Sequence, residues 1–190
     1  MNMTRALITA AACIAVAAPA AVGADVGGSD ADDLLFGTRG PDVARAGGGD
    51  DLVLLGNGRD LAFGGPGADV LMGGRHADAL LGQADADVLI GGRGFDVLVG
   101  GSGDDREIGG RHADVLYAGA GEDILIGGFG ADVLYARVAD GQVDRLHCGP
   151  GRDQAVVRGE DVADRTCERV TIVSGAEKDP GDGEEVPPAA

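Results

Sequence analysis

The stretch GGPGADVLM at residues 64–72 sets the pattern for most of this chain. Three glycines and a proline fill its first four positions, an aspartate stands at the sixth, and the apolar triplet VLM ends it. GGRHADALL at residues 73–81 and GGRGFDVLV at residues 91–99 keep nearly the same order. Such repetition predicts a small structural unit that is used many times.

An aspartate recurs at a spacing of nine residues without a gap. If this aspartate is taken as position six, twelve nonapeptide units run from Gly28 to Tyr135. Positions one, two and four are mostly glycine, and position eight is apolar in all units except the one with Glu107. The aspartates are Asp33, Asp42, Asp51, Asp60, Asp69, Asp78, Asp87, Asp96, Asp105, Asp114, Asp123 and Asp132.

The order of residues within one unit predicts the architecture of the whole array. Glycine permits backbone conformations with positive φ, which tight turns need, and positions seven to nine suffice for a short strand. Because side chains alternate across a strand, position eight points to one side and positions seven and nine to the other. One unit cannot bury its apolar side chain alone, so the units must stack. We predict an all-β solenoid of parallel strands with two units per coil, in which units n and n+2 are stacked neighbours.

Stacking also predicts a cation. Carboxylates 18 residues apart would lie at roughly the strand spacing of 4.8 Å, and like charges at that distance are destabilising unless neutralised. Ca²⁺ takes six to eight oxygen ligands, whereas Mg²⁺ requires stricter octahedral geometry. The formal net charge of −17 fits a protein that collects cations. The same charge argues against nucleic acid as a partner.

These units resemble the RTX, or haemolysin-type, calcium-binding nonapeptide repeat G-G-x-G-x-D-x-U-x, where U is a large apolar residue. The best copies are residues 64–72, 91–99 and 127–135. The resemblance implies a parallel β-roll of about twelve repeats that binds Ca²⁺ between turns and folds on binding it. Position-six aspartates and glycine-loop carbonyls would be the ligands, for at most about ten ions. The loop glycines concerned are Gly64, Gly65, Gly67, Gly91, Gly92, Gly94, Gly100, Gly101, Gly103, Gly127, Gly128 and Gly130.

The two ends of the chain differ from the array. Residues 1–24 contain an early Arg5, an apolar run, Pro19 and small residues up to Ala24, which is the pattern of a signal peptide. We therefore predict Sec-type export, an extracellular location and no membrane insertion. Residues 25–135 would form the roll, and the acidic, Pro/Gly-rich residues 174–190 a disordered tail.

Residues 136–173 resemble the disulfide-containing tail that follows such repeats in secreted proteins, and we expect them to form a small cap over the open end of the roll. Cys148 and Cys167 are the two cysteines that remain after cleavage, an even pair that predicts one disulfide. A mixed metal site with the adjacent His147 and Glu168 is the alternative.

Some positions depart from the repeat. Glu107 stands at a core position, and we expect its strand to shift so that Ile108 points inward. His76 and His112 replace glycine at position four in near-identical loops, which we interpret as tolerated substitutions rather than a second metal site. Positions seven and nine are largely apolar, so the outer faces are candidates for self-association or for docking on a cell-surface partner.

No catalytic motif is present: the sequence contains no H-E-x-x-H, no G-x-S-x-G and no P-loop. We expect no enzymatic activity. The leading hypothesis is a secreted calcium-binding protein whose folding depends on extracellular calcium and whose role is structural or adhesive at the cell surface. The alternative is a metal-independent β-solenoid scaffold that binds a surface partner or ice, although Thr38 is the only threonine in the array.

Overall fold

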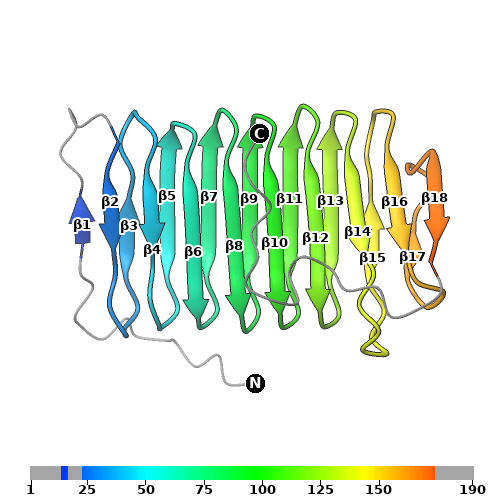
Figure 1. Cartoon of the computed structure of the whole chain (residues 1–190), viewed down its shortest axis with the longest axis horizontal. Coiled ribbons are helices and arrows are strands. Elements are labelled where there is room, and N and C mark those ends of the chain that lie inside the picture. The colour runs from blue at the N-terminus through cyan, green and yellow to red at the C-terminus, as the bar shows by residue number, and fades with distance from the viewer. Residues whose placement is uncertain (1–13, 17–22, 174–190) are drawn as a thin grey trace, which may run out of the picture.

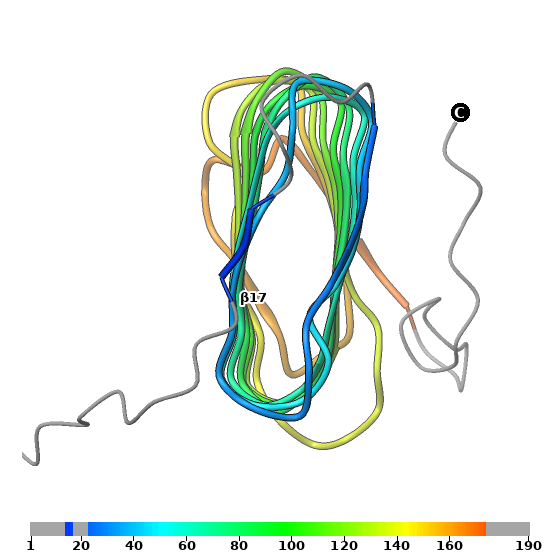
Figure 2. The same cartoon turned by 90° about the vertical axis from the view of Figure 1, so that its left-hand side faces the viewer.

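A computed structural model of the protein describes residues 14–16 and 23–173, and these form a solenoid of two parallel sheets (Figure 1). The chain crosses from one sheet to the other and back, so each coil contains one strand of each sheet. Viewed along its axis, the solenoid is a flattened ring whose long walls are the sheets and whose narrow ends are loops (Figure 2). The predicted parallel β-roll is confirmed.

Each sheet has nine strands. The odd sheet consists of β1 (Ile14–Val16), β3 (Leu34–Phe36), β5 (Leu52–Asn57), β7 (Val70–Arg75), β9 (Val88–Arg93), β11 (Arg106–Arg111), β13 (Ile124–Phe129), β15 (Arg145–His147) and β17 (Val162–Ala163). The even sheet consists of β2 (Asp25–Gly27), β4 (Val43–Arg45), β6 (Leu61–Pro66), β8 (Ala79–Ala84), β10 (Val97–Ser102), β12 (Val115–Ala120), β14 (Val133–Ala136), β16 (Gln154–Val157) and β18 (Arg169–Ile172).

The register between neighbouring strands within the array is 18 residues. Leu71 lies opposite Leu89 in the odd sheet, and Leu80 lies opposite Leu98 in the even sheet. The predicted pairing of units n and n+2 is therefore confirmed. It aligns every position of the nonapeptide along the axis, so one residue type repeats along each row.

The core is formed by the position-eight row of each sheet. Leu71, Leu80, Leu89 and Leu98 are fully buried between the two walls, and replacing one such leucine by alanine typically costs about 2–5 kcal/mol. Residues at positions seven and nine face outward but are mostly half-buried, because neighbours in adjacent coils cover each other. The rings of Tyr117 and Tyr135, for example, stack with their centroids 4.8 Å apart. Docking through these outer faces stays a prediction.

The expected shift of β11 is wrong. Glu107 is fully buried, Ile108 stays half-buried on the outer face, and Glu107 keeps its register with Leu89 and Leu125. A one-residue slip would turn every side chain of the strand to the other side. It would also break backbone hydrogen bonds at both neighbours, such as that from the Arg106 N–H to the Asp87 carbonyl.

Residues 136–173 continue the solenoid instead of forming a separate capping fold. β15 and β17 extend the odd sheet, and β16 and β18 extend the even sheet (Figure 1). A disulfide joins Cys148 and Cys167, as predicted, so these sulfurs are not free thiolates for a metal. The chain stays in the coil because its strands pair in parallel with β13 and β14, as the array's strands do with one another.

The two ends of the chain are only partly described. β1 falls inside the predicted signal peptide, of which residues 1–13 and 17–22 lie outside the described residues. The predicted tail, residues 174–190, lies outside them as well. No helix in the described part of the chain has the length and apolarity to cross a membrane.

Candidate metal centre

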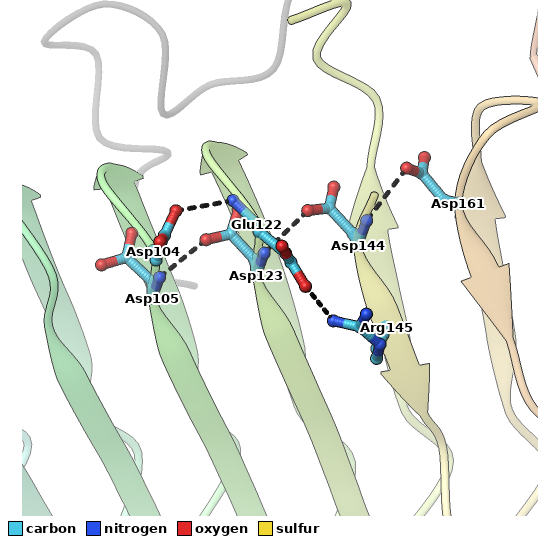
Figure 3. Close-up of polar contacts among 7 residues, drawn as sticks. All are labelled: Asp104, Asp105, Glu122, Asp123, Asp144, Arg145 and Asp161. Carbon is cyan, nitrogen blue, oxygen red and sulfur yellow. Dashed lines mark hydrogen bonds and ion pairs between the residues drawn. The ribbon is translucent and has the colours of Figure 1, made fainter. Parts of the chain in front are cut away.

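A ladder of aspartates runs along both narrow ends of the roll. The N–H group of each position-six aspartate donates a hydrogen bond to the Oδ1 atom of the aspartate one coil further on (Figure 3). The distance is 2.7 Å from Asp33 to Asp51 and 2.8 Å from Asp69 to Asp87. All twelve predicted aspartates are buried. The structure therefore brings them together in two rows, one at each end of the flattened ring.

Most of these carboxylates keep one oxygen without a partner. Within the described residues, the buried Oδ2 atom makes no hydrogen bond in ten of the twelve predicted aspartates: Asp51, Asp60, Asp69, Asp78, Asp87, Asp96, Asp105, Asp114, Asp123 and Asp132. At the N-terminal end, by contrast, the Oδ2 atoms of Asp33 and Asp42 accept from the N–H groups of Ser29 and Thr38. A buried charged group without a partner is costly, so the interior coils require a counter-charge.

The loop glycines make room for this oxygen. A Cβ atom on Gly64, at position one, would lie 2.3 Å from Asp69 Oδ2 and 2.8 Å from the carbonyl oxygen of Gly82 in the next coil. A Cβ atom on Gly82 would meet Asp87 Oδ2 and the Gly100 carbonyl in the same way. Position-one glycine thus lets a carboxylate oxygen and a carbonyl oxygen approach one another.

Burial raises the pKa of the ten ladder aspartates from Asp51 to Asp132 above the ordinary value of 3.8, and neighbouring carboxylates add to the rise at most of them. Hydrogen bonds from the ladder N–H groups lower the pKa but do not compensate. The pKa is raised to about 8 for Asp78, Asp105 and Asp114, about 7 for Asp87 and Asp123, and about 6 for Asp60, Asp69, Asp96 and Asp132. Each carboxylate therefore takes up a proton more readily than usual when no cation is bound.

These donors fit a hard cation. Among the described residues, no three His, Cys, Asp or Glu side chains gather at one point. A cation would accordingly be held by one or two carboxylates together with backbone carbonyls. A donor set of oxygen atoms alone suits Ca²⁺ and does not suit softer metals such as zinc or copper.

Two further aspartates join the ladder, and our reading of the sequence missed them. The N–H groups of Asp123 and Asp132 donate to Oδ1 of Asp144 and Asp153, each 21 residues further on. A signal was present: CGPGRDQAV at residues 148–156 has glycine at positions two and four and Asp153 at position six. Three extra residues in the loop before Asp144 displace it from the register of the array.

Four loop positions hold side chains where glycine would fit better. His76, Gln83, Asp85 and His112 have φ between 71° and 87°, in the left-handed region that costs other residues about 1–2 kcal/mol. The structure keeps His76 and His112 in separate coils, each ring bonded through Nδ1 to the preceding carbonyl. Both belong to ordinary loops of the roll, in line with the interpretation as tolerated substitutions.

Replacing Gln83 by glycine should therefore stabilise the protein. We expect a gain of about 0.5–1 kcal/mol once the larger backbone entropy of glycine in the unfolded chain is subtracted. The melting temperature of the calcium-loaded protein should rise by about 1–4 °C. Gln142→Gly is the control, because Gln142 is an exposed loop residue with negative φ. It should lower the melting temperature slightly, and an equal effect of both variants would contradict the strain at Gln83.

The two narrow ends of the roll carry opposite charge. We call the loops that follow odd-sheet strands the basic edge; within the array its exposed charged residues are Arg39, Arg59, Arg75, Arg93 and Arg111, and the coils beyond the array add Arg152, Arg165 and Glu168. We call the loops that follow even-sheet strands the acidic edge; its exposed charged residues include Asp32, Asp50, Asp85, Asp104 and Glu122. The acidic edge therefore offers a cation a more favourable field than the basic edge.

Comparison with known families agrees with this geometry. The family model described as RTX calcium-binding nonapeptide repeat (4 copies) matches residues 27–62, 56–89, 63–98, 81–111, 99–134 and 108–143. Together these matches span more than half of the 190 residues. No curated protein matches the chain.

Proposed function

Because the chain belongs to the RTX calcium-binding nonapeptide repeat family, we propose that it is a secreted protein whose folding is switched on by extracellular calcium. That it is a calcium-binding repeat protein follows from the family and the β-solenoid. Coupled folding, export and the role at the cell surface are the parts that we propose.

One observation carries the coupling between calcium and folding. Ten position-six aspartates in the described coils have a buried carboxylate oxygen with no hydrogen-bond partner. In the ionised state the stacked coils would repel one another along both edges. Calcium bound between the coils would supply the missing positive charge. The free energy of calcium binding then contributes directly to the free energy of folding, as in small metal-dependent domains.

Different positions of the repeat have different roles in binding calcium and in folding. Position-six aspartates would provide the charged ligands, and carbonyl groups of the glycine loops the neutral ones. The position-eight leucines close the core once the coils are in contact. The N–H groups of the ladder hold each Oδ1 atom in place, so the free Oδ2 atom is the one that remains to face a cation.

Circular dichroism of residues 25–190 during a calcium titration at pH 8 tests this proposal. We expect little strand signal in calcium-free buffer and a cooperative gain of strand at 10⁻⁴–10⁻³ M calcium, the range typical of extracellular modules. Magnesium at the same concentrations is the control and should produce much less strand, because it gives up its water ligands reluctantly. A strand spectrum that is already complete in EDTA would overturn the proposal and favour a metal-independent solenoid scaffold.

Two features of the chain support export and a role outside the cell. The N-terminal segment has the pattern of a cleaved signal peptide, and the disulfide between Cys148 and Cys167 is suited to an oxidising compartment. We propose a structural or adhesive role outside the cell and no catalysis. N-terminal sequencing of the protein from culture medium tests export, with residue 25 as the expected start.

A further inference from the structure

Glu107 is the one residue that breaks the inner row of the odd sheet. Its neighbours in the row, Leu89 and Leu125, are fully buried, and Glu107 is as buried as they are. Neither of its carboxylate oxygens has a hydrogen-bond partner among the described residues. A carboxylate in an apolar core without a partner is among the most destabilising groups a protein can hold.

The side chain of Glu107 reaches the acidic edge from the inside of the roll. A Cβ atom on Gly100 would lie 2.4 Å from Asp105 Oδ2, 2.4 Å from the Ala118 carbonyl oxygen and 2.9 Å from Glu107 Oε1. Three oxygens from two segments, residues 105–107 and residue 118, thus surround one small space. At the corresponding glycines Gly64 and Gly82, the nearest atoms include one aspartate and one carbonyl oxygen but no second carboxylate.

Glu107 also lies close to the carboxylates of the acidic edge. Asp105 itself donates its N–H group to Asp123 Oδ1 (Figure 3). Asp105 and Glu107 therefore face the same space at the acidic edge, and Asp123 of the next coil is hydrogen-bonded to Asp105.

We propose that Glu107 is a calcium ligand that reaches out of the core to the ion held at the loop of Asp105. This inference rests on the proposed calcium binding and adds to it an ion with carboxylates from both the loop and the core. Because calcium affinity rises with the number of charged ligands, this site binds more tightly than those with a single carboxylate. The bound calcium ion neutralises the carboxylate of Glu107, which explains why the core tolerates this residue.

Calcium isotherms of Glu107→Gln and Glu107→Leu test the proposal by titration calorimetry. Both variants should lose the tightest site, with at least a tenfold lower affinity there, while the other sites remain. The rise in melting temperature on adding calcium should also be smaller in both. Glu122→Gln is the control, since Glu122 is exposed on the same edge, and it should keep the tightest site. If Glu107→Leu keeps the wild-type isotherm, Glu107 is a protonated core residue and the proposal for Glu107 is wrong. If the wild-type protein binds no calcium at all, the proposed calcium-binding function is wrong.

A second and independent observation concerns the basic edge. Arg75, Arg93 and Arg111 lie opposite one another in consecutive coils and are all exposed. None of them pairs with a carboxylate in the described part of the chain. They line a groove of about 800 Å³ whose floor is glycine and whose end is the exposed Phe129. A row of free cations on a chain with a net charge of −17 indicates an anionic partner.

We infer that this partner is the acidic edge of a second copy of the chain. On the acidic edge, Asp32 and Asp50 lie one coil apart, and so do Asp104 and Glu122, which is the spacing of the arginines. Two parallel rolls placed edge to edge can therefore set the arginine row of one copy against a pair of carboxylates of the other. Each exposed pair contributes at most about 1 kcal/mol, so only the row as a whole holds the copies together. A basic edge against an acidic edge is a heterologous contact, which leads to open-ended assembly.

Sedimentation velocity of the calcium-loaded protein at low and high salt tests this inference. We expect association at 20 mM NaCl that is lost at 500 mM NaCl, because salt screens exposed charges. The triple variant Arg75→Gln/Arg93→Gln/Arg111→Gln should remain monomeric at both salt concentrations. The triple variant Arg45→Gln/Arg106→Gln/Arg169→Gln makes the same change in charge at exposed arginines away from the basic edge, and it should associate. The inferred contact between copies would be contradicted if the wild type is monomeric at low salt. It would also be contradicted if the triple variant of Arg75, Arg93 and Arg111 still associates. A monomer that binds added heparin through this row would assign the groove to a foreign polyanion instead.

Discussion

Without calcium, the roll should be folded at pH 5 and should lose its strand structure as the pH rises to 8. The pKa of its buried aspartates is raised to between about 6 and about 8, from 3.8 in the unfolded chain. The folded state therefore binds more protons than the unfolded state between these values. Stability falls with pH wherever the folded state holds the extra protons, so protons stabilise the metal-free roll at pH 5 and are lost by pH 8.

The expected effect is large because many groups titrate together. One pKa unit corresponds to about 1.4 kcal/mol, and the shifts at most interior aspartates are two to four units. All of these shifts act in the same direction, and a domain is usually stable by only roughly 5–15 kcal/mol. An ionised and metal-free roll should consequently not survive at pH 8.

Circular dichroism in calcium-free buffer across pH 5–8 measures this transition, and the same series with 10 mM calcium is its control. With calcium the strand signal should be constant across the range, since the cation takes the place of the protons. The variant Asp78→Asn/Asp105→Asn/Asp114→Asn removes three of the most strongly shifted groups. It should remain folded to a higher pH without calcium while gaining less from calcium. A metal-free wild type with equal stability at pH 5 and pH 8 would contradict the role that we assign to the buried carboxylates.

The sequence was sufficient to predict the repeat architecture because the same residues determine the turn and the strand. The nine-residue spacing of aspartate located each loop, and the position-eight leucines located each inward side chain. Because one coil is two units, the alignment of Asp69 with Asp87 followed directly from the count. The inner and outer faces of the strands were predictable for the same reason.

Two features needed the structure. The sequence pattern favoured a strand shift that would keep Glu107 out of the core. The ladder hydrogen bonds and the backbone pairing on both sides of β11 instead fix the register of this strand, and they outweigh the cost of one buried carboxylate. The coils beyond residue 136 were missed because a longer loop displaces Asp144 by three residues. A count that relies on strict spacing cannot follow such an insertion, whereas pairing between strands in space can.

Replacing Gly65 by alanine should push two neighbouring coils of the roll apart. Gly65 has φ of 122°, and a Cβ atom there would lie 1.8 Å from the carbonyl oxygen of Gly47 in the preceding coil. The contact is with backbone, so no side chain can move aside, and the two coils would have to separate. Together with the cost of positive φ, we expect a loss of about 3 kcal/mol or more.

The effect of Gly65→Ala should appear as a calcium midpoint at least tenfold higher in the titration by circular dichroism, because separated coils cannot share an ion. Gly159→Ala is the matched control: nothing lies within 4 Å of its Cβ position, and its φ is outside the left-handed region. That variant should titrate like the wild type. Equal midpoints for the two variants would mean that the coils need not approach closely for calcium to bind, and the shared-ion geometry would then have to be abandoned. A raised midpoint for Gly65→Ala alone would establish that calcium affinity depends on contact between backbones 18 residues apart.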